Sequence, residues 1–357
     1  MCGPAGAQEL RERLERHLGK PRDLAIVTDE NVAALYLDPM RERLRQAGWR
    51  CEGLVVPAGE ESKSLAVVER LYGRLISMDM DRGGAVLALG GGVVGDLAGF
   101  VAATYLRGID FIQMPTSLLA QVDASIGGKV GINHAAGKNL IGAFHQPRLV
   151  LVDVAYLRTL PRKEITCGLA EVLKYAVLAG EPLFGWLESR IEELAGDAVD
   201  TPFRGADWVQ TVASCAAIKA QVVADDEREA DKRMLLNLGH TFGHGLEQAG
   251  GFRDFSHGEA VGWGTAVATD VAVRLGLLST AEGARIERLF ARAGLPTSVR
   301  GYSVEAVMEA MRSDKKRSSG RLRFVLPRAI GDVAVVSDVP GADIAAALRC
   351  RLGDESR

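Results

Sequence analysis

Short apolar runs alternate with longer amphipathic segments over the first 155 residues of the chain. The apolar runs predict strands at residues 24–27, 53–56, 85–89, 111–114 and 149–152. Between them, apolar side chains recur every three or four positions, which predicts helices with one buried stripe. One stripe is Leu10, Leu14 and Leu18, and another is Leu65, Val68, Leu71 and Leu75. Strands that alternate with helices are typical of a parallel sheet covered by helices.

After Pro161 the strand pattern stops and the helical period takes over. We expect helices at 162–180, 182–195, 204–228, 232–249, 257–276 and 279–293, then a hairpin of 321–326 with 332–336 and a final helix. A chain of 357 residues exceeds the usual size of one core. The expected fold class is therefore α/β, with a Rossmann-like nucleotide-binding domain at 1–160 and a mainly α-helical metal- and substrate-binding domain at 161–357.

Charge and composition narrow the classes of partner. The net charge is −3, and the longest basic patch is Lys315–Arg317, so nucleic acid is not expected as a partner. Five cysteines without a C-x-x-C pair argue against both a disulfide framework and a thiolate zinc site. No run of eighteen apolar residues occurs, so we expect a cytoplasmic protein that does not bind a membrane.

A glycine turn follows the strand predicted at 85–89. The sequence Gly90-Gly91-Gly92-Val93-Val94-Gly95-Asp96 leads from this strand into an apolar helix, an order that lets a pyrophosphate approach backbone N–H groups. The acidic residue that usually binds the ribose about twenty residues downstream is missing. Acidic candidates lie upstream instead, at Asp29 and Glu60. A turn that only packs the strand on the helix is the alternative.

A second glycine-rich segment, residues 123–139, contains Lys129, Lys138, Asn133 and Asn139. Converging backbone N–H groups together with lysine charge suit a phosphate or a carboxylate. An exposed flexible loop would have a similar composition. Because apolar runs flank the segment, we favour an anion site.

Three of the six histidines, His240, His244 and His257, fall within eighteen residues, and a segment with Glu171 precedes them. Imidazole and carboxylate are the ligands of a catalytic zinc that keeps one position open. We predict that 233–244 is one helix, with Arg233, Asn237, His240 and His244 on a single face. Spacing alone nominates His240 and His244 as joint ligands. The stretch from Ser256 to Glu259 could equally be a helix cap.

The whole chain resembles the 3-dehydroquinate synthases of the sugar-phosphate cyclase superfamily. The motifs that carry the resemblance follow one another in a continuous order: Gly90–Gly99, Asp110–Thr116, Leu119–Asp123, Gly127–Lys129, Asn133-His134, Gly137–Asn139, Gly142–Phe144, Gly168–Val172, Asn237–His244, His257–Glu259 and Asp314–Lys316. Departures are small, at Ser117, Val130 and Ala135-Ala136, and none removes a charged group.

This resemblance implies NAD and Zn²⁺ as cofactors, with Co²⁺ as an alternative metal, and a homodimer in which Arg107 reaches the neighbouring subunit's site. The implied metal ligands are Glu171, His240 and His257, with His244 facing substrate. The implied NAD contacts are Asp29, Glu60, Lys63, Gly91, Gly92, Asp96, Thr116, Ser117, Lys129, Lys138 and Thr159. The implied catalytic residues are Asp123, Lys129, Lys174, Arg233, Asn237 and His244, and the implied substrate contacts are Arg107, Lys138, Asn139, Lys219, Lys315 and Lys316.

The implied substrate is 3-deoxy-D-arabino-heptulosonate 7-phosphate, converted to 3-dehydroquinate and phosphate in the shikimate pathway to aromatic amino acids. The implied route is transient oxidation by NAD, β-elimination of phosphate, reduction, ring opening and an intramolecular aldol reaction. Two alternatives stay open at this point. One is another sugar-phosphate cyclase, of the amino-dehydroquinate or epi-valiolone synthase type, and the other is a metal-dependent polyol dehydrogenase, which would accumulate NADH.

Overall fold

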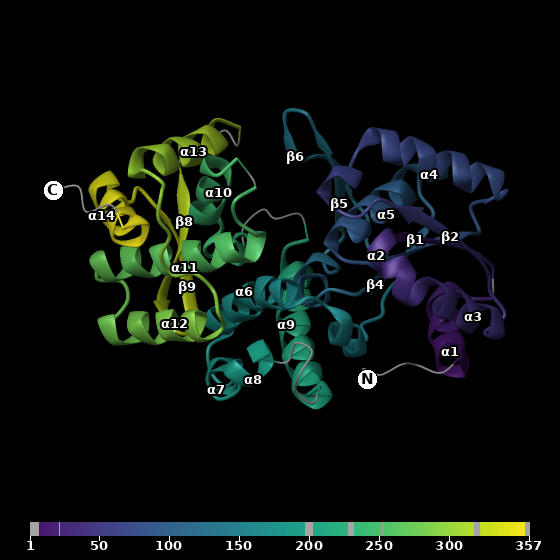
Figure 1. Cartoon of the computed structure of the whole chain (residues 1–357), viewed down its shortest axis with the longest axis horizontal. Coiled ribbons are helices and arrows are strands. Elements are labelled where there is room, and N and C mark those ends of the chain that lie inside the picture. Colours follow the sequence, from purple (N-terminus) through teal and green to yellow (C-terminus); the bar gives the residue numbers. More distant parts are fainter. Residues whose placement is uncertain are drawn as a thin grey trace. The chain divides into compact units, whose positions relative to one another are not determined.

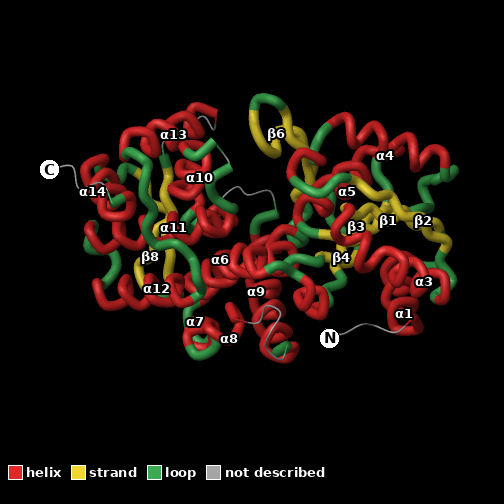
Figure 2. Tube along the Cα trace, in the orientation of Figure 1, coloured by secondary structure: helices red, strands yellow, loops and turns green. Residues whose placement is uncertain are grey.

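The computed structural model describes residues 7–20, 22–196, 203–227, 232–251, 253–317 and 322–353, without the side chains of 313–317. The chain divides into two compact units, drawn in Figures 1 and 2. The first comprises Met1–Leu160 with Trp208–Val212, and the second comprises Pro161–Asp207 with Ala213–Arg357.

A five-stranded parallel sheet forms the centre of the first unit, in the order β2-β1-β3-β4-β7. Its strands are β1 (Asp23–Asp29), β2 (Arg50–Val56), β3 (Ala85–Gly90), β4 (Asp110–Pro115) and β7 (Leu149–Val150). The five predicted strands are thus confirmed, although β7 is shorter than expected. The helices are α1 (Ala7–Leu18), α2 (Glu30–Val32), α3 (Asp38–Gln46), α4 (Leu65–Ser77) and α5 (Gly92–Thr104).

Both faces of this sheet are buried, because alternate strand residues point to opposite cores. Leu24 and Ile26 of β1 pack in one core with α1 and α3, whereas Ala25 and Val27 pack in the other with α4 and α5. The predicted stripe on α1 is buried. On α4 the stripe begins only at Val68, because Leu65 is the first residue after the Ser64 cap and is 58% exposed.

Much of the glycine-rich segment forms a β-hairpin of β5 (Lys129–His134) and β6 (Gly137–Phe144), rather than the flexible loop that was the alternative to an anion site. Residues Gly131 and Gly142 face each other so closely that a Cβ on either would meet the backbone of the other strand at 2.8 or 2.6 Å. Glycine at these two positions therefore lets the two strands pair closely, which the amino-acid composition of the segment alone did not predict. Short helical turns complete the unit: η1 (Ala33–Leu37), η2 (Glu60–Ser62), η3 (Tyr105–Arg107), η4 (Ala120–Ala124) and η5 (Val154–Thr159).

The second unit is mainly helical, as expected. Its helices are α6 (Arg162–Ala179), α7 (Leu183–Glu188), α8 (Ile191–Gly196), α9 (Gly205–Asp225), α10 (His240–Ala249), α11 (His257–Arg274), α12 (Thr280–Arg292), α13 (Val304–Arg317) and α14 (Gly341–Leu352). The predicted hairpin is present as β8 (Arg323–Ala329) and β9 (Asp332–Ser337). Helix α11 is buried along most of its length and packs against α6, α10, α12, α14 and β8.

Three expectations for this unit were wrong in detail. The helix expected at 182–195 is two helices, α7 and α8, and the Ser189 hydroxyl between them donates to the carbonyl of Trp186 at 2.7 Å. Helix α13 was not anticipated. The helix expected at 232–249 is broken: a 3₁₀ turn, η6 (Lys232–Asn237), ends before Gly239, which has a left-handed φ of 79°, and α10 begins at His240.

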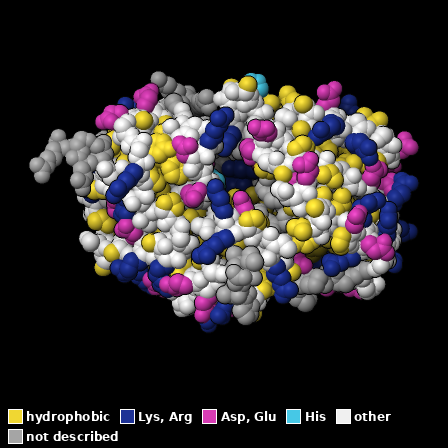
Figure 3. Space-filling view, viewed as in Figure 1, with side chains coloured by type: hydrophobic (Ala, Val, Ile, Leu, Met, Phe, Trp, Pro, Cys, Tyr) yellow, Lys and Arg dark blue, Asp and Glu magenta, His cyan; other side chains and the backbone are white. Residues whose placement is uncertain are grey.

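Within the described ranges, none of the helices combines the length and the apolar character that crossing a membrane requires. On the face shown in Figure 3, basic side chains lie interspersed with acidic ones.

Candidate metal and nucleotide sites

Three helices of the second unit bring one carboxylate and two imidazoles together. Glu171 lies in the middle of α6, His240 opens α10 and His257 opens α11. The Oε1 atom of Glu171 is 3.5 Å from His240 Nε2 and 3.6 Å from His257 Nε2. Ligand atoms around a tetrahedral zinc with bonds of about 2.0–2.1 Å lie roughly 3.3–3.4 Å apart. The three residues therefore fit a zinc ion.

Close helix contacts make this cluster possible. A Cβ on Gly258 would lie 2.3 Å from the carbonyl oxygen of Cys167, so only glycine lets the start of α11 approach α6. A Cβ on Gly239 would lie 2.4 Å from Thr265 Oγ1 of α11, and the left-handed backbone there also favours glycine. These contacts bring the start of α10 close to α11 and the start of α11 close to α6.

Hydrogen bonding leaves the Nε2 atom of each histidine facing the cluster. His240 Nδ1 lies 3.1 Å from the carbonyl oxygen of Leu238, which can only accept, so Nδ1 carries the proton and Nε2 is free to bind a cation. His257 Nδ1 lies 3.6 Å from Oε1 of Glu247. Such outer partners orient metal-binding imidazoles. The sequence reasoning missed Glu247, whose signal was a carboxylate one helical turn after His244.

The electrostatics of the cluster favour a bound positive charge. Burial lowers the pKa of His240 to about 3, so its imidazole is neutral, as a metal ligand must be. Burial alone would also lower the pKa of His257, but hydrogen bonding to Glu171 and Glu247 outweighs it and raises the pKa to about 10. The carboxylates of Glu171 and Glu247 thus both stabilise a positive charge at His257.

His244 lies one turn after His240 and is exposed. Its ring centroid is 5.5 Å from that of His240 and 6.2 Å from that of His257. Among the described residues, the groups of three ligand atoms within 4.8 Å are Glu171 with His240 and His257, and His244 with Glu247 and His257. Neither group contains the His240 and His244 pair that helical spacing nominated.

The other expected substrate residues of the second unit are mostly buried. Lys174 Nζ is 2.5 Å from Oε2 of Glu171, and both side chains are at most 2% exposed. Lys219 and Arg233 are 6% and 3% exposed, and an Arg233 guanidinium N–H donates to the carbonyl of Glu227 at 2.7 Å. Asn237 ends the turn η6. Lys315 and Lys316 lie in α13, but their side chains are outside the described set.

In the first unit, most of the residues expected to bind NAD lie at or after the carboxyl ends of β1, β2, β3 and β4: Asp29 ends β1, Glu60 and Lys63 follow β2, Gly91, Gly92 and Asp96 follow β3, and Thr116 and Ser117 follow β4. Thr159 ends the turn η5. Asp29 caps α2 by accepting the N–H groups of Asn31 and Val32. Gly91 is the N-cap of α5, and a Cβ there would meet Ser117 Oγ at 3.3 Å. The N–H of Thr116 donates to the carbonyl of Gly90 at 2.9 Å. The glycine turn places the N-terminus of α5 next to the carboxyl end of β3, an arrangement that suits a pyrophosphate.

The hairpin β5–β6 and its neighbours carry the residues expected to bind the substrate phosphate. Lys129 is exposed at the start of β5, and Lys138 and Asn139 are exposed on β6. Asp123 lies in the turn η4. Arg107 is exposed with a left-handed φ of 69°, which is an unusual conformation for a residue with a side chain.

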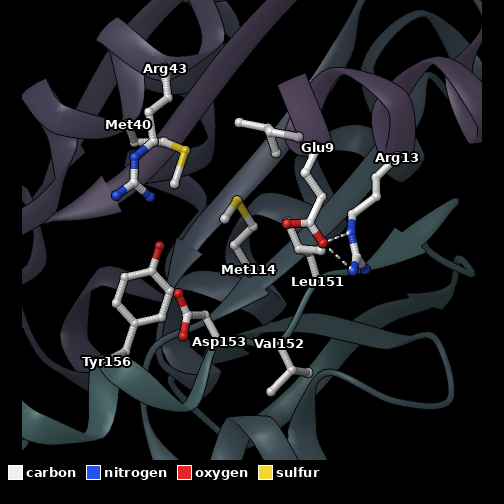
Figure 4. A pocket seen from close by; sticks show the side chains of 10 residues that line it. Glu9, Arg13, Met40, Arg43, Met114, Leu151, Val152, Asp153 and Tyr156 are labelled. Carbon is white, nitrogen blue, oxygen red and sulfur yellow. Dashed lines mark hydrogen bonds and ion pairs between the residues drawn. The ribbon is translucent and has the colours of Figure 1, made fainter. Parts of the chain in front are cut away.

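A small pocket of the first unit is lined by residues other than those expected to bind NAD, metal or substrate (Figure 4). It lies between α1, α3, β4 and the segment from Leu151 to Tyr156. Arg13 there is paired with Glu9 at 2.7 Å, and burial raises the pKa of Tyr156. None of the residues expected to bind NAD, metal or substrate lines this pocket.

Solved structures with a similar arrangement include two sugar-phosphate cyclases. The 2-epi-5-epi-valiolone synthase of Streptomyces hygroscopicus, solved with NAD⁺ and Zn²⁺ bound, superposes with a TM-score of 0.84 at 29% identity, covering 92% of this chain and 90% of that one. A 2-deoxy-scyllo-inosose synthase complexed with carbaglucose-6-phosphate, NAD⁺ and Co²⁺ gives a TM-score of 0.85 at 24% identity, covering 98% and 96%. The fold is therefore that of the cyclases.

Sequence comparison is more specific. Residues 53–167 match the family model of the 3-dehydroquinate synthase N-terminal region, and residues 168–317 match that of the C-terminal region. The 3-dehydroquinate synthase of Desulforamulus reducens is 48% identical over 338 residues, covering 94% of this chain and 91% of that protein. The chain belongs to the 3-dehydroquinate synthase family. The resemblance stated from the motifs is confirmed.

Proposed function

We propose that the residues described above carry out the family's reaction, which converts 3-deoxy-D-arabino-heptulosonate 7-phosphate to 3-dehydroquinate and phosphate. The observation that carries this proposal is the cluster of Glu171, His240 and His257, which would hold zinc through one carboxylate oxygen and two Nε2 atoms. The first unit would be the NAD-binding domain and the second the metal- and substrate-binding domain.

In the first unit, NAD would bind across the carboxyl ends of β1, β3 and β4. The glycine turn and the α5 N-terminus would take the pyrophosphate, since their N–H groups point at the ligand. The side chains around the remainder would be Asp29, Glu60, Asp96, Thr116, Ser117 and Thr159. When bound, NAD supplies a reversible hydride acceptor, and zinc supplies a Lewis acid for the substrate hydroxyl groups.

Anionic groups at the two ends of the substrate would be held by separate sets of side chains. Lys129, Lys138 and Asn139 would bind the phosphate by charge and N–H donation, with Arg107 as a further contact. Arg233 and Lys219 would bind the carboxylate, where the planar fork of arginine matches two oxygen atoms. Arg233 and Lys219 are buried, so little water would compete with a substrate carboxylate for their charges.

The remaining side chains would position reacting groups rather than act as strong bases. Lys174, already paired with Glu171, would stabilise negative charge next to the metal. His244, Asn237 and Asp123 would hold substrate hydroxyl groups. An oxygen of the departing phosphate is itself basic enough to accept the proton that elimination releases, so tight binding of that group is the main requirement.

A single incubation tests the function. The zinc- and NAD-loaded protein is supplied with the heptulosonate phosphate, and phosphate release, 3-dehydroquinate and absorbance at 340 nm are followed together. We expect equal amounts of phosphate and 3-dehydroquinate without net NADH, because the hydride returns to the product. Stoichiometric NADH would instead indicate a polyol dehydrogenase, and phosphate release with another carbocycle would indicate a different cyclase.

We also propose that the enzyme acts in the cytoplasm as a homodimer. The four described cysteines, Cys51, Cys167, Cys215 and Cys350, are free thiols, as expected in a reducing compartment. The dimer is supported by the exposed and strained Arg107, whose expected contact is with the neighbouring subunit's substrate.

A further inference from the structure

A closed ring of polar contacts joins the hairpin β5–β6 to the glycine-turn helix of the first unit. Lys63 is the member of this ring that contacts both α5 and β6, and its side chain is only 4% exposed. Its ammonium group donates to Asp96 Oδ2 of α5 at 2.7 Å and to Asn139 Oδ1 of β6 at 2.5 Å. Asn133 of β5 completes the ring, since its amide donates to Glu60 Oε1 at 2.8 Å while its Oδ1 accepts the N–H of Asn139 at 2.8 Å.

The ring determines which end of the Asn139 amide faces the proposed anion site. A lysine ammonium has three donors and no acceptor, so the Asn139 atom next to it must be the oxygen. The NH₂ group of Asn139 is then directed away from Lys63 and is available to donate. A phosphate accepts hydrogen bonds only, so it requires this orientation and is repelled by the opposite one.

The backbone of Asn139 also depends on the ring. Its φ of 54° is left-handed, a region that asparagine tolerates but that the chain does not favour. The Asn139 N–H bond to Asn133 and the Asn133 N–H bond to the carbonyl of Lys63, at 2.8 Å, fix the backbone on both strands. Residues 138–140 are exposed, so their side chains are not held in a packed core.

We propose that Lys63 is a positioning residue that acts on the phosphate through Asn139. The resemblance places Lys63 among the NAD contacts, whereas its burial and its bonds to Asp96 and Asn139 favour this indirect role. The inference rests on the proposed function only in taking Asn139 as a phosphate contact.

A double-mutant cycle on the zinc- and NAD-loaded protein tests the proposal, with the dissociation constant of inorganic phosphate measured by calorimetry. Asn139→Ala should raise that constant about ten-fold or more, the loss of one hydrogen bond to a charged group. Lys63→Met should raise it by a similar factor. In the Asn139→Ala background, Lys63→Met should change it by less than about two-fold, because both substitutions remove the same contact.

Two further variants separate amide orientation from charge and from folding. Lys63→Met removes the ammonium partner of the Asp96 carboxylate, so the cycle is repeated with Lys63→Met combined with Asp96→Asn, which removes both charges of this ion pair together. Lys63→Arg keeps a donor-only cation and should restore most of the phosphate affinity. Exposed Lys20→Met, in the same unit, serves as the control for loss of one lysine.

Each result has a separate meaning. Additive effects of Lys63→Met and Asn139→Ala in the charge-neutral cycle would overturn the proposal, as would a ten-fold loss of NAD affinity with unchanged phosphate affinity in Lys63→Met. If Asn139→Ala alone leaves the phosphate constant unchanged, the assigned phosphate contact of the proposed function is wrong, and the inference falls with it.

Discussion

His257 offers two nitrogen atoms, and each faces a different carboxylate. Nε2 faces Glu171 in the proposed metal cluster, and Nδ1 faces Glu247 on α10. Glu247 is 8% exposed, so little water competes for its carboxylate. A carboxylate behind a metal-binding imidazole fixes the tautomer and the ring orientation.

We therefore predict that Glu247→Gln binds zinc about 10- to 100-fold more weakly, the range for loss of such an outer partner. Competition with a chromophoric chelator measures the zinc dissociation constant, and the visible absorption of the cobalt-loaded protein reports the ligand geometry. Exposed Gln248→Ala on the same helix is the matched control and should match the parent in both. Unchanged zinc affinity in Glu247→Gln would mean that Glu247 has only a packing role.

Substitution of His257 and substitution of His244 should have different effects on the zinc content of the protein. His257→Ala should lose zinc, because it removes one of the three converging ligand atoms. His244→Ala should retain zinc and turn over slowly. Elemental analysis after gel filtration decides between them, and zinc loss in His244→Ala would favour the helical pair of His240 and His244.

Residue spacing could identify the histidines and the segment with Glu171 as candidate metal ligands, but it could not show which of them bind the same metal ion. The left-handed Gly239 separates Arg233 and Asn237 from the histidines, so the predicted four-residue face is not one helix. His240 and His244 do lie one turn apart on α10, but the atoms that converge with His240 come from α6 and α11, and spacing within one segment cannot show this. The grouping of Glu171, His240 and His257 came from the family resemblance. Glu247 was missed, and Asn133 was named only as a member of the glycine-rich segment, because the roles of both depend on contacts between separate elements, which no local pattern contains.

At the scale of elements, long amphipathic helices and buried strands were the most predictable, because each carries its own period. The five strands of the parallel sheet and the helices α6, α9, α11 and α12 lie within a few residues of the expected positions. The hairpin β5–β6 was missed, because its glycines and exposed polar residues conceal the period of two. Helix α13 went unrecognised for no reason that the structure explains.

Arg351 links the helix α14 to α11 and α12 through ion pairs. These ion pairs make the stability of the protein depend on pH. Arg351 of α14 donates to both oxygens of Asp270 on α11, at 2.6 and 2.7 Å, and also pairs with Glu287 on α12. The side chain of Arg351 is 11% exposed, whereas that of Glu287 is 38% exposed. Hydrogen bonding to Arg351 lowers the pKa of Glu287 below its usual value of 4.5.

We predict that Arg351→Met lowers the free energy of unfolding by about 2 kcal/mol, less than a fully buried pair because its carboxylates reach solvent. A depressed carboxyl pKa contributes stability that is present above the unfolded pKa and is lost as pH falls through the folded pKa. The parent should therefore lose more stability than the variant between about pH 5 and pH 3.

Urea unfolding at several pH values measures both effects, with exposed Arg349→Met on the same helix as the control. Parallel pH profiles for parent and Arg351→Met would show that the Arg351 contacts do not set the pKa of Glu287. Equal losses of unfolding free energy in Arg351→Met and Arg349→Met would show that stability depends on the overall charge of α14 rather than on the contacts of Arg351.

At the scale of the whole molecule, the proposed dimer would let each chain supply Arg107 to the substrate site of the other. Leu106 and Arg107 are consecutive left-handed residues, with φ values of 50° and 69°, and both are exposed. Backbone strain of this kind persists where the surrounding structure requires it, often at functional positions. A solvent-facing arginine in such a turn is suited to reach another chain.

Subunit complementation tests this arrangement directly. Arg107→Ala and His257→Ala should each be inactive as purified homodimers, the first through poor phosphate binding and the second through zinc loss. After mixing and subunit exchange, half of the dimers contain one chain of each kind. In these, the site with intact metal ligands on the Arg107→Ala chain receives Arg107 from its partner, so about a quarter of wild-type activity should return. If Arg107 serves its own chain, both sites of the mixed dimer stay defective and no activity returns. Light scattering confirms the dimer, and co-purification of an untagged chain with an affinity-tagged one confirms the exchange. A monomeric protein, or one that does not exchange, is thereby distinguished from an arginine that acts within its own subunit.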